Sequence, residues 1–216
     1  MCEACNSRRS ISLGFTEEHV LEGQHLCYIY RDDAERRRTM ARYVASGLLE
    51  SEKVLFMADT VSPDEMLGEM RDLDIDIDQY QDRLTLGPAT GSYLPTGAFE
   101  CHTMLSYVEQ YYRQAVEDEG CAGARGMGEM NWCLDSGSAD VMALMEYETR
   151  LNSLLTTHPF TACCQYDARL FDGGTIMDVL AVHPVAIVRG QLVRNPFYVP
   201  PETFLHELAH RRHTEL

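Results

Sequence analysis

The chain has 216 residues, and its 45% hydrophobic and 24% charged content suits a globular protein that can bury a core without disulfides. Its formal net charge of −16 repels phosphate backbones and anionic lipid headgroups, which argues against direct nucleic-acid or membrane binding. No apolar run approaches the roughly 18 residues that span a bilayer, and the first residues carry no secretion signal, so we expect a cytoplasmic protein.

The first part of the chain predicts a β-α-β unit. Residues 1–23 lack periodicity, and no regular element is expected there. Residues 25–30 (HLCYIY) form the kind of apolar run that a buried parallel strand shows. In the following segment Asp32 and Glu35 resemble a capping box, and an apolar residue recurs every four positions up to Leu48, which predicts a helix. Residues 53–58 (KVLFMA) predict the second strand.

The same alternation continues to the end of the chain. Helices are expected at 63–73, from Phe99 to Ala115, at 141–155, at 175–181 and from Pro200, with strands at 83–86, 126–130 and 160–166 and a hairpin of 184–188 and 191–193. Alternating strands and helices predict a three-layer α/β fold, with helices on both faces of a mostly parallel sheet and an antiparallel edge hairpin near the C-terminus. We expect one domain over 25–204, an N-terminal extension (1–24) and a C-terminal helical tail (205–216).

Aromatic and charged side chains gather where the expected strands end, which is where open α/β sheets bind their ligands. The candidate ligand-binding residues there, with one from a following loop, are Tyr30, Arg31, Asp59, Tyr93, Glu129, Trp132, Tyr166, Asp167 and Arg169. Trp and Tyr would form apolar walls, while the charged groups would orient a small uncharged or weakly polar molecule. Strand-end capping and salt bridging are the alternative roles for the same residues.

The first strand runs into residues 31–38 (RDDAERRR), where nucleotide hydrolases of this topology carry G-x-x-x-x-G-K-[ST]. The segment has no glycine to let the backbone approach a phosphate and no lysine, and acidic side chains crowd the helix N-terminus. The sequence therefore excludes phosphate binding of that type. Because no complete catalytic centre is present, we predict a sensor or binding module and not an enzyme.

Metal sites are alternatives that the sequence leaves incomplete. His206 and His210 match H-E-x-x-H, but only six residues follow, so we expect no distant downstream ligand, and His213 lies too close for the longer metzincin spacing. Cys2 and Cys5 form a C-x-x-C pair that lacks a second pair, and two of the residues His19, His25 and Cys27 would complete it only if the N-terminus folded back.

Two further polar residues have ordinary explanations at this stage. Glu148 interrupts an apolar helix face, which a salt bridge to Arg150 or another arginine explains as well as a pocket role. His183 is interpreted as a capping or surface histidine. We expect no cofactor; a metal- or redox-responsive Cys/His sensor and a residual nucleotide-binding or metal-dependent hydrolase are the alternatives.

Several short segments, in their order and spacing, resemble the MEDS (DcmR-like) sensory domain family from about His25 to Phe204. The family's H-x-C-x-x-Y pattern is matched by His25, Cys27 and Tyr30. The other matching segments are 128–132 (GEMNW), 147–152 (YETRLN), 164–167 (CQYD), 183–184 (HP) and 195–201 (NPFYVPP).

This resemblance implies a fold derived from KaiC- and RecA-like ATPases that has lost its phosphate loop. It also implies sensing of a small molecule, often a hydrocarbon derivative, coupled to transcription or signal transduction. Members commonly carry a helix-turn-helix, kinase or PAS module, for which the terminal segments here are too short. We therefore expect a fused module or a separate signalling or DNA-binding partner protein, and the oligomeric state stays open, with a homodimer as one option.

Overall fold

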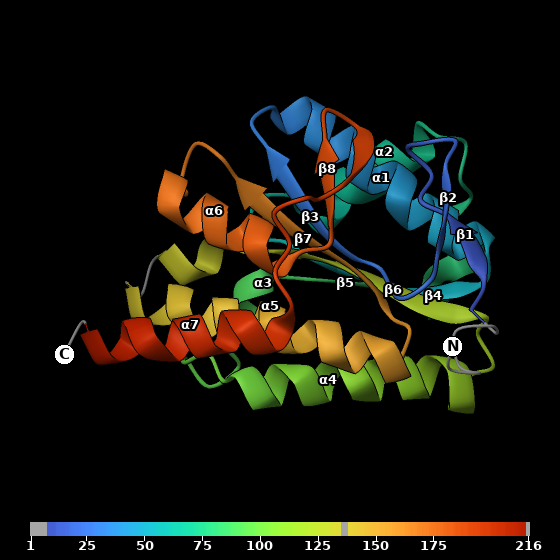
Figure 1. Cartoon of the computed structure of the whole chain (residues 1–216). Helices are drawn as coiled ribbons and strands as arrows, with labels where there is room; N and C mark the ends of the chain where they lie inside the picture. Colours follow the sequence, from blue (N-terminus) through green and yellow to red (C-terminus); the bar gives the residue numbers. More distant parts are fainter. Residues whose placement is uncertain (1–7, 135–137, 215–216) are drawn as a thin grey trace.

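A computed structural model of the chain describes residues 8–134 and 138–214 (Figure 1). A seven-stranded sheet lies at its centre, in the order β5-β4-β6-β7-β3-β8-β9. The strands are β3 (His25–Tyr30), β4 (Glu52–Met57), β5 (Leu84–Gly87), β6 (Gly123–Glu129), β7 (Thr161–Asp167), β8 (Val185–Val188) and β9 (Gln191–Arg194). A separate two-stranded sheet pairs β1 (Ser10–Ser12) with β2 (His19–Leu21).

Every neighbouring pair in the central sheet is parallel except β8 with β9. Strands β4, β6 and β7 are buried along their whole length, as expected for parallel strands covered on both faces. The β8–β9 turn lies at Arg189 and Gly190, whose φ angles of 50° and 69° suit a two-residue hairpin turn. The predicted three-layer α/β arrangement with an antiparallel edge hairpin is confirmed.

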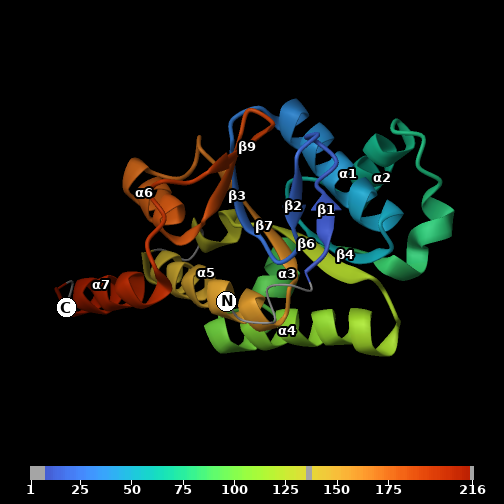
Figure 2. The ribbon, with the colours of Figure 1, turned by 45° about the vertical axis from the view of Figure 1, so that its right-hand side comes forward.

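Helices cover both faces of this sheet (Figures 1 and 2). One face packs against α1 (Asp33–Leu49), α2 (Pro63–Arg71) and the β1–β2 hairpin. The other face packs against α3 (Ala89–Tyr93), α4 (Cys101–Arg113), α5 (Ser138–Thr157), α6 (Gly173–Val182) and α7 (Pro201–Thr214). Within the described residues, no helix combines the length and the apolar character needed to cross a membrane. The sheet thus separates two cores, called below the α1 face and the α5 face.

The structure departs from the sequence expectation in two segments. Residues 10–21 form the β1–β2 hairpin, in which Ile11 is fully buried on the α1 face. Its strands of three residues are too short to show an alternating pattern. The helix expected from Phe99 begins at Cys101, and the preceding loop contains the five-residue helix α3.

A chain of buried charges joins this hairpin to the central sheet. Arg125 of β6 pairs with Glu52 of β4, and both side chains are almost completely buried. The Arg125 guanidinium also donates to the backbone carbonyl oxygens of Ser12 and Tyr43, at 3.0 and 3.2 Å. Arg9 Nη2 donates to the second carboxylate oxygen of Glu52 at 2.5 Å. The hairpin is therefore held by charge pairing as well as by apolar packing.

We expect Arg125→Met to lower the free energy of unfolding by about 3–5 kcal/mol, because Glu52 would keep a buried charge without its main partner. Arg113→Met is the control: it removes an exposed arginine paired with Glu109 one helical turn away, and should cost less than about 1 kcal/mol. Urea unfolding of the two variants and the wild-type chain measures both effects. Equal losses in the two variants would contradict the importance assigned to the buried pair.

Candidate functional site

The carboxyl ends of β3, β6 and β7 lie side by side at one edge of the sheet. Tyr30 pairs in register with Asp167, and Glu129 pairs with Gln165. A cavity of about 230 Å³ opens beside these ends on the α1 face. Its lining includes Tyr30, Asp33, Arg36, Thr60, Asn131, Asp167 and Arg169. We refer to it as the strand-end cavity.

Two carboxylates, those of Asp32 and Asp33, occupy the start of α1 where it follows β3. The Asp32 side chain accepts a hydrogen bond from the backbone amide of Glu35 at 2.6 Å and so caps α1, as predicted. The Asp33 carboxylate binds Arg169 Nη1 and Nη2 at 3.0 and 2.6 Å. Because carboxylates already occupy this helix start, it does not offer the anion site that phosphate loops use.

Arg36 of α1 provides the buried cationic wall of the strand-end cavity. Its Nε donates to Gln165 Oε1 at 2.8 Å, and its Nη1 donates to Thr60 Oγ1 at 2.5 Å. The guanidinium carbon lies 4.5 Å from the centre of the Tyr30 ring, and that of Arg169 lies 6.0 Å from the same ring. An aromatic face next to two guanidinium groups is a favourable electrostatic arrangement.

Three buried polar atoms of this wall make no hydrogen bond within the described part of the chain: Tyr30 Oη, Asn131 Oδ1 and Arg36 Nη2. Arg36 Nη2 does lie 3.4 Å from a carboxylate oxygen of Glu129, within ion-pair range. Burial raises the pKa of the Tyr30 hydroxyl, which keeps it protonated and able to donate. Native proteins rarely leave buried polar atoms unpaired, so the wall has free hydrogen-bonding capacity for a ligand.

Glu129 lies behind the cavity and organises the loop after β4. Its fully buried carboxylate accepts hydrogen bonds from the backbone amides of Asp59 and Thr60, at 2.8 and 3.0 Å. Asp59 in turn accepts a hydrogen bond from the Thr90 amide, at the start of α3, at 3.0 Å. The β4–α2 loop is therefore tied to β6 on one side and to α3 on the other.

The structure brings only part of the predicted site together. Tyr30, Asp167 and Arg169 line the strand-end cavity, Glu129 and Asp59 support it, and Arg31 is exposed.

Three of the predicted side chains point to the α5 face. Tyr93 and Trp132 stack there with ring centres 5.0 Å apart, and Tyr93 also lines a second cavity, of about 350 Å³, next to α4. Tyr166 is fully buried on the same face, because successive strand residues point to opposite sides and its neighbour Asp167 faces the cavity.

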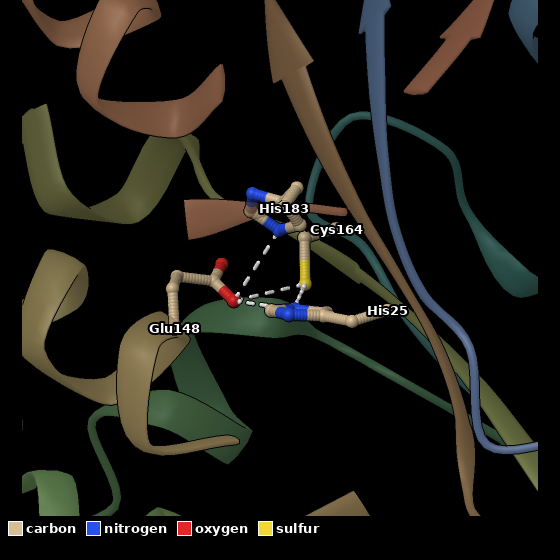
Figure 3. Close-up of side chains that lie close together, drawn as sticks. All are labelled: His25, Glu148, Cys164 and His183. Carbon is tan, nitrogen blue, oxygen red and sulfur yellow. Dashed lines mark hydrogen bonds and ion pairs between the residues drawn. The ribbon is translucent and has the colours of Figure 1, made fainter. Parts of the chain in front are cut away.

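A second polar group lies on the α5 face and was not predicted as a site. It consists of His25, Glu148, Cys164 and His183, and we call it the buried tetrad (Figure 3). The tetrad's side chains are all buried, and each offers a nitrogen, oxygen or sulfur atom within 4.8 Å of the others. His25 belongs to β3, Glu148 to α5 and Cys164 to β7, and His183 directly follows α6.

The carboxylate of Glu148 is the centre of this tetrad. Its Oε2 lies 3.0 Å from His25 Nε2, 3.6 Å from His183 Nε2 and 3.3 Å from Cys164 Sγ. Its Oε1 accepts a hydrogen bond from the Tyr166 hydroxyl at 2.6 Å. Burial alone would raise the pKa of Glu148, but the two histidines hold that pKa below its usual range, so the group is a carboxylate. Burial also lowers the pKa of His25 and raises that of Cys164 well above its usual value.

These contacts correct two sequence interpretations. Of the two roles considered for Glu148, a salt bridge to an arginine is wrong: Arg150 pairs with Glu146, at 2.9 Å, and the Glu148 partners are histidines. His183 does bond the last turn of α6, through Val179, but it is fully buried and not a surface residue. In the sequence, the signal for the buried tetrad was the position of Glu148 on an apolar helix face.

The other candidate metal motifs find no support in the described residues. His206 and His210 stack on the exposed surface of α7, and they form no metal-ligand group with Glu207. Cys2 and Cys5 lie outside the described residues.

Residues 24–184 match the model of the MEDS family, described as the methanogen/methylotroph, DcmR sensory domain. A curated relative, the transcriptional repressor DcmR of Methylorubrum extorquens (strain DSM 6343 / CIP 106787 / DM4), is 27% identical over 161 residues. That alignment covers 74% of this chain and 57% of the repressor, so the chain spans little more than half of that relative's length.

The fold also has a structural counterpart. The crystal structure of a KaiC-like protein from the hyperthermophilic archaeon Pyrococcus horikoshii OT3 superposes with a TM-score of 0.56 at 13% sequence identity. The superposition covers 83% of this chain and 79% of the archaeal one. The core of this chain therefore has a RecA/KaiC-like three-layer fold. Because the family model matches well over half of its length, the chain belongs to the MEDS family of sensory domains.

Proposed function

We propose that the chain is a non-catalytic sensory module that binds a small polar molecule in the strand-end cavity and passes that state to a signalling or DNA-binding partner. The observation that carries this proposal is the set of buried polar atoms of Tyr30, Arg36 and Asn131 on one cavity wall whose hydrogen-bonding capacity is not fully used within the described residues. Family membership and a relative described as a transcriptional repressor support a regulatory output.

The size and charge of the cavity limit the ligand. About 230 Å³ is below the range of roughly 300–1,000 Å³ that holds drug-sized ligands, so the ligand has few heavy atoms. The lining combines Asp33 and Asp167 with Arg36, Arg37 and Arg169, which nearly balances the charge. A short-chain compound with one neutral or singly anionic polar group fits this lining, in keeping with the hydrocarbon derivatives that the family resemblance implies.

A route by which binding would reach the surface is present in the contacts. Arg36 and Glu129 both contact Thr60, and the neighbouring Asp59 holds Thr90 at the start of α3. A ligand that engages Arg36 would favour one arrangement of the β4–α2 loop over another and so shift its population. The exposed loop would then present a different surface to the partner.

Nucleotide hydrolysis is the less favoured reading of the same fold. The KaiC-like counterpart shares the architecture at 13% identity, which bears on fold alone. In this chain the Asp32 cap and the Asp33–Arg169 pair occupy the helix start that would receive phosphate.

We expect Tyr30→Phe to weaken ligand binding by about 2- to 13-fold, which corresponds to one hydrogen bond of about 0.5–1.5 kcal/mol. The melting temperature of the ligand-free protein should change little, because the only side chain that acts on this hydroxyl as a hydrogen-bonding neighbour within the described residues is Asn131, and no well-formed bond joins them. The measurement is calorimetry with hits from a thermal-shift panel of short-chain alcohols, amides and carboxylates.

Tyr107→Phe is the matched control, because it also removes a tyrosine hydroxyl, but from a residue that lines the second cavity. Its affinity should equal that of the wild-type chain. Weaker binding in Tyr107→Phe together with wild-type affinity in Tyr30→Phe would move the ligand to the cavity near α4. Failure of the entire panel together with no co-purifying small molecule in native mass spectrometry would count against the proposal itself.

We expect Glu129→Gln to loosen the β4–α2 loop, because the buried Arg36 loses its counter-ion and two backbone amides lose charge-assisted bonds. The free energy of unfolding should fall by about 1.5–3 kcal/mol, and the Asp59 and Thr60 amides should exchange faster with solvent. Hydrogen exchange followed by NMR measures this, with Glu69→Gln as control, which changes a partly exposed glutamate of α2 that pairs with Arg37 and has no contact with this loop among the hydrogen bonds of the described residues. Unchanged protection at residues 59 and 60 would remove Glu129 from the coupling route.

A further inference from the structure

The buried tetrad is independent of the strand-end cavity and is not explained by the proposed function. It lies on the opposite face of the sheet, and the exposed fractions of His25, Glu148, Cys164 and His183 are 2%, 0%, 3% and 0%. Buried polar side chains of this kind are retained when they serve a structural or binding role, since each must find partners within the protein. Figure 3 shows the donor atoms directed toward one another.

The spacing of the donor atoms matches that around a tetrahedral metal ion. Ligand atoms at zinc bond lengths of about 2.0–2.3 Å lie about 3.3–3.6 Å from each other. In the tetrad, Glu148 Oε2 lies 3.0, 3.3 and 3.6 Å from the His25, Cys164 and His183 donors. The Cys164 Sγ to His25 Nε2 separation is 3.6 Å. An ion would require shifts of only a few tenths of an ångström in these four separations, and the other two, from His183 Nε2 to the His25 and Cys164 donors, are no longer than 4.8 Å.

Both histidines are set in the tautomer that a metal ligand needs. His183 Nδ1 faces the Val179 carbonyl oxygen at 2.8 Å, and His25 Nδ1 faces Asn152 Oδ1 at 3.1 Å. The Asn152 amide nitrogen donates to the Val182 carbonyl oxygen at 2.8 Å, which fixes its oxygen toward His25. With protons on the outer nitrogens, both Nε2 lone pairs point into the tetrad. Such outer hydrogen bonds to acceptors are the usual support of metal-binding histidines.

Without a cation this arrangement leaves polar atoms unpaired. His25 Nε2 and His183 Nε2 compete for the same Glu148 carboxylate oxygen, at 3.0 and 3.6 Å, and His183 Nε2 makes no hydrogen bond within the described residues. A divalent ion bound by Glu148 and the Cys164 thiolate would bring the net charge of the site to zero, which a fully buried site favours.

We propose that His25, Glu148, Cys164 and His183 form a closed binding site for a divalent transition-metal ion of the zinc class. Mixed nitrogen, sulfur and oxygen donors suit zinc and its neighbours better than magnesium or calcium. Four protein ligands leave no open position, so the site is structural and joins α5 and the end of α6 to β3 and β7. Because Tyr166 bonds Glu148 and precedes Asp167, the ion would also fix the strand that carries part of the strand-end cavity.

The test measures metal in the full chain and compares two neighbouring cysteines. Wild-type protein reconstituted with Zn²⁺ or Co²⁺ and then desalted should hold about one ion per chain by elemental mass spectrometry. The Co²⁺ form should show the near-ultraviolet charge-transfer absorption of a cobalt–thiolate bond. Cys164→Ser should abolish that absorption, whereas Cys163→Ser should keep it, because Cys163 is equally buried but lies on the α1 face.

Further variants keep the proposal falsifiable if Cys164→Ser fails to fold. Asn152→Ala leaves all four ligands in place and should weaken Zn²⁺ binding by about 10- to 100-fold through loss of the His25 support. A Cys2→Ser, Cys5→Ser double variant should retain the ion. Absence of metal from the folded, reconstituted wild-type chain, equal cobalt absorption in the Cys163 and Cys164 variants, or loss of the ion in the Cys2, Cys5 variant would each overturn the proposal. None of these outcomes depends on ligand binding in the strand-end cavity.

Discussion

The central strands are covered on both faces, so every charge that they carry must be compensated inside the protein. Two carboxylates of these strands, and a third on helix α5 that packs against them, show what this constraint produces. Glu52 pairs with Arg125 and holds the N-terminal hairpin, while Glu129 pairs with Arg36 and holds the loop beside the cavity. Glu148 has no guanidinium partner and is surrounded by imidazole, thiol and phenol groups. The carboxylates with arginine partners support the structure, whereas the neighbours of Glu148 include the side chains of the proposed metal site.

Strand β7 connects the two regions on which the proposals rest. Alternation along the strand directs Cys164 and Tyr166 to the α5 face, and Gln165 and Asp167 to the α1 face. One rigid, fully buried strand therefore contributes both to the tetrad and to the cavity. Because close-packed interiors transmit strain, we expect a movement of β7 at the buried tetrad to reach the strand-end cavity as well.

Much of the fold could be predicted from the sequence because its signals are local. Contiguous apolar runs marked the parallel strands, Asp32 marked the start of α1, and Arg189-Gly190 marked the hairpin turn. The absence of the phosphate-loop motif at residues 31–38 could also be seen in the sequence, because that motif is contiguous. The β1–β2 hairpin escaped prediction because its strands are too short for a periodic pattern.

The candidate site was harder to predict because its geometry is not local. Tyr166 was grouped with Asp167 although neighbouring strand residues point to opposite faces, and Trp132 follows β6 in a short 3-10 helix whose direction no sequence pattern defines; both lie on the α5 face. The tetrad draws on residues 25, 148, 164 and 183, which only the strand order β7-β3-β8 brings together. Each of the four lies in a different short segment of the family resemblance, no single motif contains all four, and each one alone has an ordinary explanation.

The carboxylate cap of α1 has a consequence for how this protein responds to its surroundings. In a nucleotide-binding relative of this fold, the start of the equivalent helix is completed by a phosphate from solution, so its order follows the concentration of that phosphate. Here the group that completes the helix start is the Asp32 side chain, which is part of the chain itself. The start of α1 is therefore capped at every phosphate concentration, and this contact gives the helix no dependence on a ligand from solution.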